Sequence, residues 1–152
     1  MLARHDEAAT GSEATMTQGG ARIIPFLRYR DAQKAIGWLC EAFGFSRHAV
    51  YEDEVGKVAH AELSYDGGFI MLGEMKDDAL GMRTPAELGA VNQGIYVVVD
   101  DTDAHYARAK AAGAEIVLDI KNQPYGSREY TARDLEGNLW SFGTYAPPAE
   151  GG

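Results

Sequence analysis

The sequence predicts an α+β fold made of two tandem modules, each with the order strand, helix, strand, strand, strand (βαβββ). The main evidence is an internal repeat with an offset of 69 positions, in which Asp31, Ala35 and Gly44 recur as Asp100, Ala104 and Gly113. In each copy an Asp stands where a helix N-cap is expected, and a Gly follows where the helix can end in the left-handed conformation. Two such units placed side by side create a groove, so matching positions of both copies are expected to face it.

The first module is expected over residues 21–75. An apolar strand over residues 22–30 precedes a helix over residues 31–43, whose apolar side chains recur at helical spacing. Three strands follow at 46–52, 57–65 and 68–74. The dipeptide Asp66-Gly67 favours a hairpin turn between the last two.

A polar linker over residues 76–91, rich in Gly and Pro, leads to the second module at residues 92–146. This module is expected to contain a strand at 93–100, a helix from 102 to about 112, and strands at 115–120, 127–133 and 139–145. Asp101 or Thr102 is expected to cap the helix, and Gly137 to provide a positive φ in the turn at 134–138. We therefore expect one domain over residues 21–146, between a flexible N-terminal tail at 1–20 and a C-terminal tail at 147–152.

The composition is typical of a globular domain, with 45% hydrophobic and 24% charged residues among 152. The formal net charge of −9 argues against nucleic acid or an anionic membrane as a partner. A single cysteine, Cys40, excludes a disulfide framework and a cysteine-based zinc cluster. No apolar run reaches the length of a membrane helix and the N-terminus lacks the apolar core of a signal peptide, so a cytoplasmic location is expected.

Two stretches of the chain, "DAQKAIGWLCEAFGF" and "YGSREYTARDLEGNLWSF", together with the repeat, resemble the vicinal oxygen chelate superfamily. This superfamily contains glyoxalase I, extradiol dioxygenases, fosfomycin-resistance enzymes and bleomycin-resistance proteins. The likeness covers about residues 22–145 and is strongest to the glyoxalase and bleomycin-resistance-like branch. It implies that the two modules form a cup-shaped, eight-stranded mixed sheet and that the protein assembles as a homodimer.

In metal-dependent members of that superfamily, the resemblance implies one ligand on the first strand of each module and a carboxylate on the last strand. The matching positions here hold Ile24 and Gln93 on the first strands, and Met71 and Ser141 on the last. Ile has no donor atom, a thioether suits hard cations poorly, and Gln and Ser carry no charge. No metal or other cofactor is therefore expected at these positions.

A divalent metal at a relocated site is the alternative. His60 and Glu62 lie two residues apart on one strand and so share a face, and Glu74 ends the next strand. These three side chains are the candidate ligands.

A ligand site is expected in the cup. Strand parity with Ile24 and Gln93 places Phe26 and Ile95 on the same wall. The last strands are expected to add Met71, Leu139 and Ser141 to this wall, while His60, Arg128 and Tyr130 are expected nearer the rim.

Such a wall is mostly apolar and is typical of a site that orients an uncharged ring system. The segment with Tyr125, Arg128 and Tyr130 combines two aromatic rings with a cation, which suits an aromatic or anionic small molecule. The alternative interpretation is that these tyrosines cover the core.

Two classes of function remain. The first is a small-molecule-binding protein of the bleomycin-resistance type, with a metal-free cup that sequesters a drug or metabolite. The second is a metal-dependent lyase, isomerase or dioxygenase with relocated ligands. The residues at the four expected metal positions favour binding without catalysis, and no catalytic residue is assigned.

Overall fold

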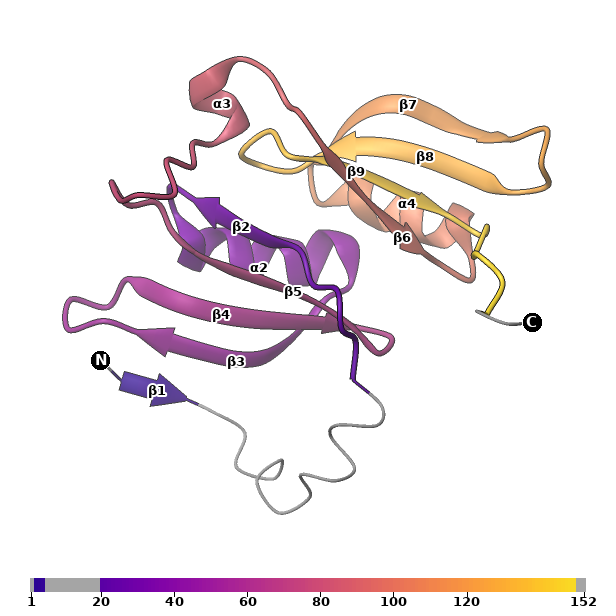
Figure 1. Cartoon of the computed structure of the whole chain (residues 1–152). Coiled ribbons are helices and arrows are strands. Elements are labelled where there is room, and N and C mark those ends of the chain that lie inside the picture. Colours follow the sequence, from indigo (N-terminus) through magenta and orange to yellow (C-terminus); the bar gives the residue numbers. More distant parts are fainter. Residues whose placement is uncertain (1, 5–19, 150–152) are drawn as a thin grey trace. The chain divides into compact units, whose positions relative to one another are not determined.

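The computed structural model describes residues 2–4 and 20–149, which form two units (Figure 1). The first unit contains the described residues up to Cys40 together with 44–84, and the second contains 41–43 and the described residues from Pro85 onward. The boundary after Thr84 falls inside the segment predicted as a linker, residues 76–91.

The first unit contains a five-stranded mixed sheet with the strand order β1-β3-β4-β5-β2. Its elements are β1 (Leu2–Arg4), β2 (Phe26–Tyr29), α2 (Ala32–Phe43), β3 (Ser46–Glu52), β4 (Val58–Tyr65) and β5 (Gly68–Glu74). The strand β2 runs parallel to β5, and the other neighbours are antiparallel. Strand β1, which pairs with β3, lies in the segment predicted as a tail. The rest of that tail, apart from Gly20, lies outside the described residues.

The second unit repeats this arrangement in a four-stranded mixed sheet with the order β6-β9-β8-β7. Its elements are the short helix α3 (Pro85–Leu88), β6 (Gly94–Val98), α4 (Thr102–Ala111), β7 (Glu115–Asn122), β8 (Arg128–Arg133) and β9 (Leu139–Gly143). The α+β class and the repeated βαβββ order are thus confirmed. The eight predicted strands form two four-stranded sheets, with β1 added at the edge of the first.

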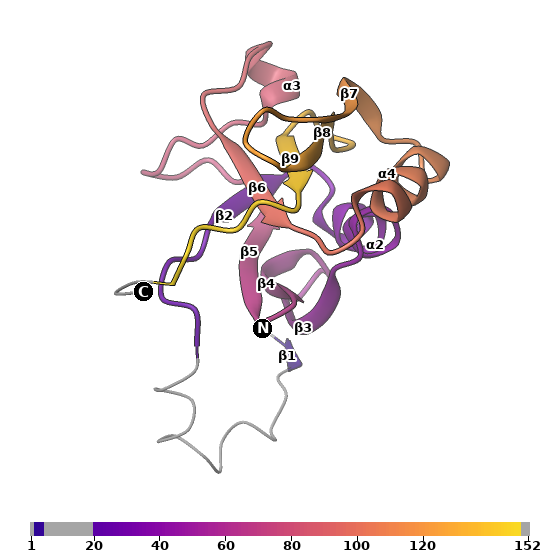
Figure 2. The same cartoon turned by 90° about the vertical axis from the view of Figure 1, so that its right-hand side faces the viewer.

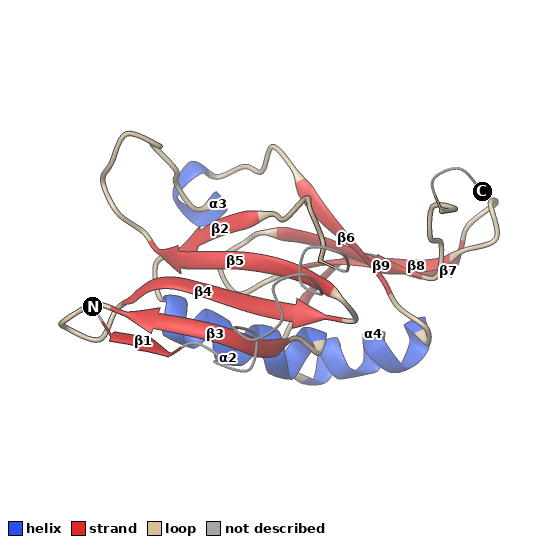
Figure 3. Cartoon of the chain, turned by 60° about the horizontal axis from the view of Figure 1, so that its bottom comes forward, coloured by secondary structure: helices blue, strands red, loops and turns tan. Residues whose placement is uncertain are grey.

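A helix covers one face of each sheet, and α2 buries an apolar stripe whereas α4 buries Thr102, His105 and Ala109. In the first unit, α2 runs along one side of the sheet (Figure 3) and buries Ala35, Ile36 and Leu39 completely. In the second unit, α4 lies on one side of β8 and β9 (Figure 2), where Trp140 and Phe142 of β9 are fully buried. In the described part of the chain, no helix is long and apolar enough to cross a membrane.

Strand pairing corrects the repeat offset at the first strand of each module. Phe26 pairs with Met71 in the first sheet and Tyr96 pairs with Ser141 in the second, which gives an offset of 70 for these strands. The helix N-caps agree, because Asp31 and Asp101 each accept a hydrogen bond from the backbone N–H three residues ahead. The predicted offset of 69 holds at Gly44 and Gly113, because 11 residues separate Asp101 from Gly113 whereas 12 separate Asp31 from Gly44. Ile24 therefore corresponds to residue 94 and not to residue 93.

One turn fixes the direction of the side chains on β9. Buried Asp134 accepts hydrogen bonds from the backbone N–H groups of Glu136 and Asn138 at 2.9 and 3.0 Å. Its Oδ2 atom also accepts the indole Nε1–H of Trp140 at 3.0 Å. Because successive side chains of a strand alternate between faces, anchoring Trp140 on the helix side sends Ser141 to the opposite face.

A turn in the first unit provides a matched comparison. Asp53 begins the turn between β3 and β4, and its Oδ1 atom accepts the backbone N–H groups of Val55 and Lys57 at 3.0 and 2.9 Å. Gly56 and Gly137 take the same place in the two turns, each with a positive φ. The turn at Asp53 is more exposed than the turn at Asp134.

Replacing Asp134 tests this anchor. Asp134→Ala leaves the Trp140 indole N–H, the Asn138 side-chain amide and two backbone donors without their acceptor, and should lower the free energy of unfolding by about 2–4 kcal/mol in urea denaturation. Asp53→Ala removes the turn bonds alone and should cost about 1 kcal/mol or less. Equal losses in the two variants would contradict the special role of the bonds from Trp140 and the Asn138 side chain.

Candidate ligand-binding site

The site is built on the face of the second sheet opposite α4, called here the open face. Register places Tyr96 beside Ser141, Ser141 beside Thr131, and Glu129 beside Gly143. Side chains that are directly paired across strands project to the same side of a sheet. The open face therefore receives residues from three adjacent strands, β6, β9 and β8.

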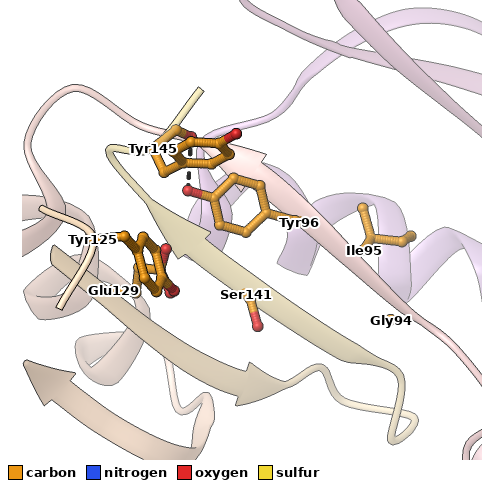
Figure 4. A pocket seen from close by; sticks show the side chains of 7 residues that line it. All are labelled: Gly94, Ile95, Tyr96, Tyr125, Glu129, Ser141 and Tyr145. Carbon is orange, nitrogen blue, oxygen red and sulfur yellow. Dashed lines mark hydrogen bonds between the residues drawn. The ribbon is translucent and has the colours of Figure 1, made fainter. Parts of the chain in front are cut away.

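A cavity of about 460 Å³ lies on this face. Figure 4 shows the residues that line it, which are Gly94, Ile95, Tyr96, Tyr125, Glu129, Ser141 and Tyr145. Three of the seven are tyrosines, one is a carboxylate and one is a hydroxyl. The cavity thus combines large ring surfaces with a few polar groups, as small-molecule sites generally do.

Hydrogen bonds hold the tyrosines in place. The Tyr96 hydroxyl donates to the backbone oxygen of Tyr145 at 2.8 Å, which ties β6 to the segment after β9 (Figure 4). The Tyr125 hydroxyl donates to Oε1 of Glu129 at 2.7 Å. The rings of Tyr125 and Tyr145 meet edge to face with centroids 6.1 Å apart. Because the hydroxyl groups of Tyr96 and Tyr125 are engaged, their ring surfaces are the parts left for a ligand.

The pKa values of the Tyr96 and Tyr125 phenols at the cavity are raised, so both groups keep their protons. Burial raises the pKa of Tyr96, and the nearby charge of Glu129 adds to this effect against a hydrogen bond with Ser127. The hydrogen bond to Glu129 raises the pKa of Tyr125. At neutral pH both side chains are therefore neutral hydrogen-bond donors.

Gly143 leaves the room that Tyr96 and Glu129 occupy. A Cβ at this position would lie 2.8 Å from the Tyr96 hydroxyl oxygen and closer still to Cγ of Glu129. Real Cβ atoms do not approach neighbours this closely, so any larger residue would displace both side chains. Glycine at position 143 is thus a geometric requirement of this cavity.

The predicted site residues of the second module fall into three groups. Ser141 lines the cavity, and Leu139 lies on the same face. Ile95 borders the cavity but pairs with buried Trp140. Its side chain therefore projects to the helix side of the sheet, and the prediction that it shares a face with Ser141 is wrong. Gln93 precedes β6 and does not line the cavity. Tyr96 takes the place predicted for Ile95 because the offset between the first strands is 70.

Arg128 and Tyr130 do not lie at the rim. Both alternate with Glu129 along β8 and so project to the helix side of the sheet. Arg128 binds both carboxylate oxygens of Asp103 at 3.1 and 3.2 Å. Tyr130 is 1% exposed, and its hydroxyl lies 2.7 Å from Nδ1 of His105. The alternative interpretation, that the tyrosine covers the core, is right for Tyr130.

Sequence reasoning missed Glu129 as a cavity residue, although the repeat carries a signal for it. Glu62 pairs with Met71, and Thr131 pairs with Ser141, so the strands β4 and β8 match with an offset of 69. With this offset, His60, which is predicted to bind the ligand, corresponds to Glu129 in the second unit. The second unit thus holds a carboxylate where the first holds an imidazole.

The predicted site residues of the first module gather on two smaller cavities. A cavity of about 300 Å³ is lined by Phe26, His60 and Met71 among others. A second, of about 170 Å³, is lined by Ile24, Met71, His48 and Glu62 among others. The structure therefore brings Ile24, Phe26, His60 and Met71 to one region of the first unit, and their role in binding a ligand stays a prediction.

Comparison with known proteins identifies the family. The model of the Glyoxalase/Bleomycin resistance protein/Dioxygenase superfamily matches residues 21–142. The chain belongs to this superfamily. Among its relatives is an uncharacterised protein of Mycobacterium bovis, 33% identical over 123 residues that cover 80% of this chain and 81% of the relative.

Solved structures of the superfamily share the fold. TioX from Micromonospora sp. ML1 is 33% identical, with a TM-score of 0.69, over 84% of this chain and all of TioX, a coverage of 100%. TnmS3 from Streptomyces sp. CB03234, an antibiotic-binding protein, is 20% identical with a TM-score of 0.61, over 80% of this chain and 93% of its own. At 20% identity the second likeness concerns the fold alone.

The metal site of the metal-dependent members of the superfamily does not fit this chain. The corrected offset replaces Gln93 by Gly94, so the four positions offer Ile24, Met71, Gly94 and Ser141. The Ser141 hydroxyl is already hydrogen-bonded to Thr131 at 2.7 Å. No carboxylate or imidazole stands at any of the four positions, so the side chains a divalent cation prefers are missing there.

The relocated metal site is not assembled either. Glu62 lies 3.0 Å from Nε2 of His60 and 3.9 Å from Nε2 of His48. Glu74, however, accepts the backbone N–H of Ala32 at 3.2 Å and thereby stabilises the start of α2. Within residues 2–4 and 20–149, no group of three or more His, Cys, Asp or Glu side chains could hold a metal ion.

A substitution at Gly143 tests the geometry of the cavity. Gly143→Ala should lower the free energy of unfolding by about 1–3 kcal/mol, because the added methyl group overlaps Glu129 and Tyr96. Gly37→Ala in helix α2 is the matched control, since a methyl group there would meet no atom within 4 Å beyond its own helix backbone and chain neighbours. It should raise stability by about 0.4–1 kcal/mol, as Gly to Ala does in helices. Stabilisation by both substitutions, measured by denaturation, would contradict the close packing around Gly143.

Proposed function

We propose that this protein binds a small aromatic molecule in the cavity of its second unit and sequesters it without metal-dependent chemistry. The observation that carries this proposal is the 460 Å³ cavity with its three tyrosine rings. Cavities of about 300–1,000 Å³ with aromatic walls and a few fixed polar groups are typical for ligands of drug size. Aromatic rings held by hydrogen bonds offer stacking surfaces at low entropic cost.

The hydroxyl groups of Ser141 and Tyr96 suit binding better than catalysis. The Ser141 hydroxyl is paired with Thr131, and the Tyr96 hydroxyl is paired with a backbone oxygen. A nucleophile or general acid needs a reacting atom that is free to meet the substrate and exchange a proton. Both hydroxyls are engaged in structural contacts instead, and these contacts favour a role in orienting a ligand.

One protein with the same fold is named for binding. TnmS3, which shares the fold, is an antibiotic-binding protein. This likeness makes sequestration of a drug or metabolite the appropriate class of function to test, while the choice of site rests on the cavity of this chain.

The proposal is tested by substituting Tyr96 in the second unit and Phe26, which occupies the matching position in the first unit. A panel of fused-ring aromatic compounds is screened by thermal shift, and the affinity of the best binder is then measured by calorimetry for each variant. Tyr96→Leu should weaken binding about tenfold, or about 1.4 kcal/mol, because one stacking surface is lost. Phe26→Leu, at the matching position of the first unit, should leave the affinity unchanged. A loss with Phe26→Leu alone would move the site to the first unit and refute the proposal.

We also propose that two copies of the chain pair as a homodimer. The strand β7 forms one edge of the second sheet and carries Val117 and Leu118, which are 38% and 61% exposed. An open sheet edge with apolar side chains favours association with a second copy. Light scattering at micromolar concentration should give about twice the 16.5 kDa of one chain. A mass near 16.5 kDa would contradict the dimer.

A further inference from the structure

The carboxylate of Glu129 is the charged group of the second-unit cavity. One of its oxygens, Oε1, accepts the hydroxyl of Tyr125 at 2.7 Å. Ion pairs in the described part of the chain involve other acidic residues, and no Lys or Arg described there lies within 4.0 Å of Glu129. A carboxylate has about four lone-pair sites, so Glu129 keeps the capacity to accept a donor from a ligand.

The nearest candidate for an internal counter-ion is directed elsewhere. Arg128 adjoins Glu129 in the chain but projects to the other side of β8. There its guanidinium binds the carboxylate of Asp103 and the amide oxygen of Asn122 at 3.2 Å. The cavity therefore presents negative charge without the cation that the sequence predicts beside it.

The tyrosine rings add to the preference for positive charge. Tyr96, Tyr125 and Tyr145 present ring edges and faces to the same cavity. The face of an aromatic ring carries partial negative charge and attracts ammonium and aza-aromatic cations. The chain as a whole has a net charge of −9, which draws cations toward it.

We propose that the cavity selects an aromatic ligand that carries a positive charge, with Glu129 as its counter-ion and the tyrosines as its stacking surfaces. Suitable groups are a protonated amine attached to a ring system, or a ring nitrogen that is quaternary. This inference rests on the proposed binding function and specifies the charge class of the ligand. The first-unit cavity, which has His60 at the position matching Glu129, does not share the preference.

Two probes of similar shape test the inference. The cation N-methylquinolinium is compared with quinoline, which is uncharged at neutral pH, by calorimetry on the full-length protein. The wild-type protein should bind the cation about tenfold more tightly than quinoline, the order expected for an ion pair together with a cation–π contact. Equal affinity for the two probes, or no binding of the cation, would overturn the inference.

Two variants assign the preference to Glu129. Glu129→Gln keeps the shape of the side chain and should reduce the preference for the cation to about twofold or less, with little change for quinoline. Glu115→Gln removes the same charge from β7, away from the cavity, and should leave the preference intact. An equal effect of both variants would assign the preference to net charge and overturn the role of Glu129.

Salt provides a measurement that needs no variant. Rising ionic strength should weaken binding of the cation and leave quinoline unaffected, because only the charged probe is attracted by the carboxylate. If both probes ignore salt, the charge inference fails. If Tyr96→Leu still weakens quinoline binding in that case, the proposed binding function stands.

Discussion

The hydrogen bond from the Trp140 indole to the buried carboxylate of Asp134 is the constraint on which the second unit depends. It fixes one large side chain of β9 on the helix side of the sheet. The alternation of a strand then determines every other position, so Phe142 is buried, while Ser141 and Gly143 face away from α4. A slip by one residue would exchange the two faces and remove the cavity. The same residues that complete the core thus set the binding surface.

The duplicated modules keep one topology but differ in chemistry on the open face. Phe26 corresponds to Tyr96, Met71 to Ser141, and His60 to Glu129. Each of these differences adds a hydroxyl or a negative charge to the second unit. Gly143, which has no side chain, leaves room for the side chains of Tyr96 and Glu129. The cavity of the second unit has a volume of about 460 Å³, against about 300 Å³ for the first-unit cavity lined by Phe26, His60 and Met71.

Sequence patterns predict the fold well, because caps, glycine turns and apolar spacing are local signals. Asp31 and Gly44 mark the ends of α2, and the strands at 46–52 and 68–74 have the predicted bounds. The site is harder, because it depends on register, and register is a property of paired strands. The second module has one residue fewer between its N-cap and its helix-ending glycine, so the first strands match at an offset of 70 and Tyr96 replaces Ile95 on the open face. Successive side chains of β8 likewise project to opposite faces of the sheet, so Glu129 lines the cavity and the predicted residue Arg128 does not.

Binding of a ligand on the open face of the second sheet is the central claim, and backbone amide NMR tests it most directly. Titrating N-methylquinolinium into isotope-labelled protein should shift the amide signals of Gly94, Tyr96, Ser141 and Gly143 most strongly. The signals of Phe26, His60 and Met71 in the first unit should move little. Largest shifts in the first unit, or shifts confined to the helix side of β8 and β9, would contradict binding at this face.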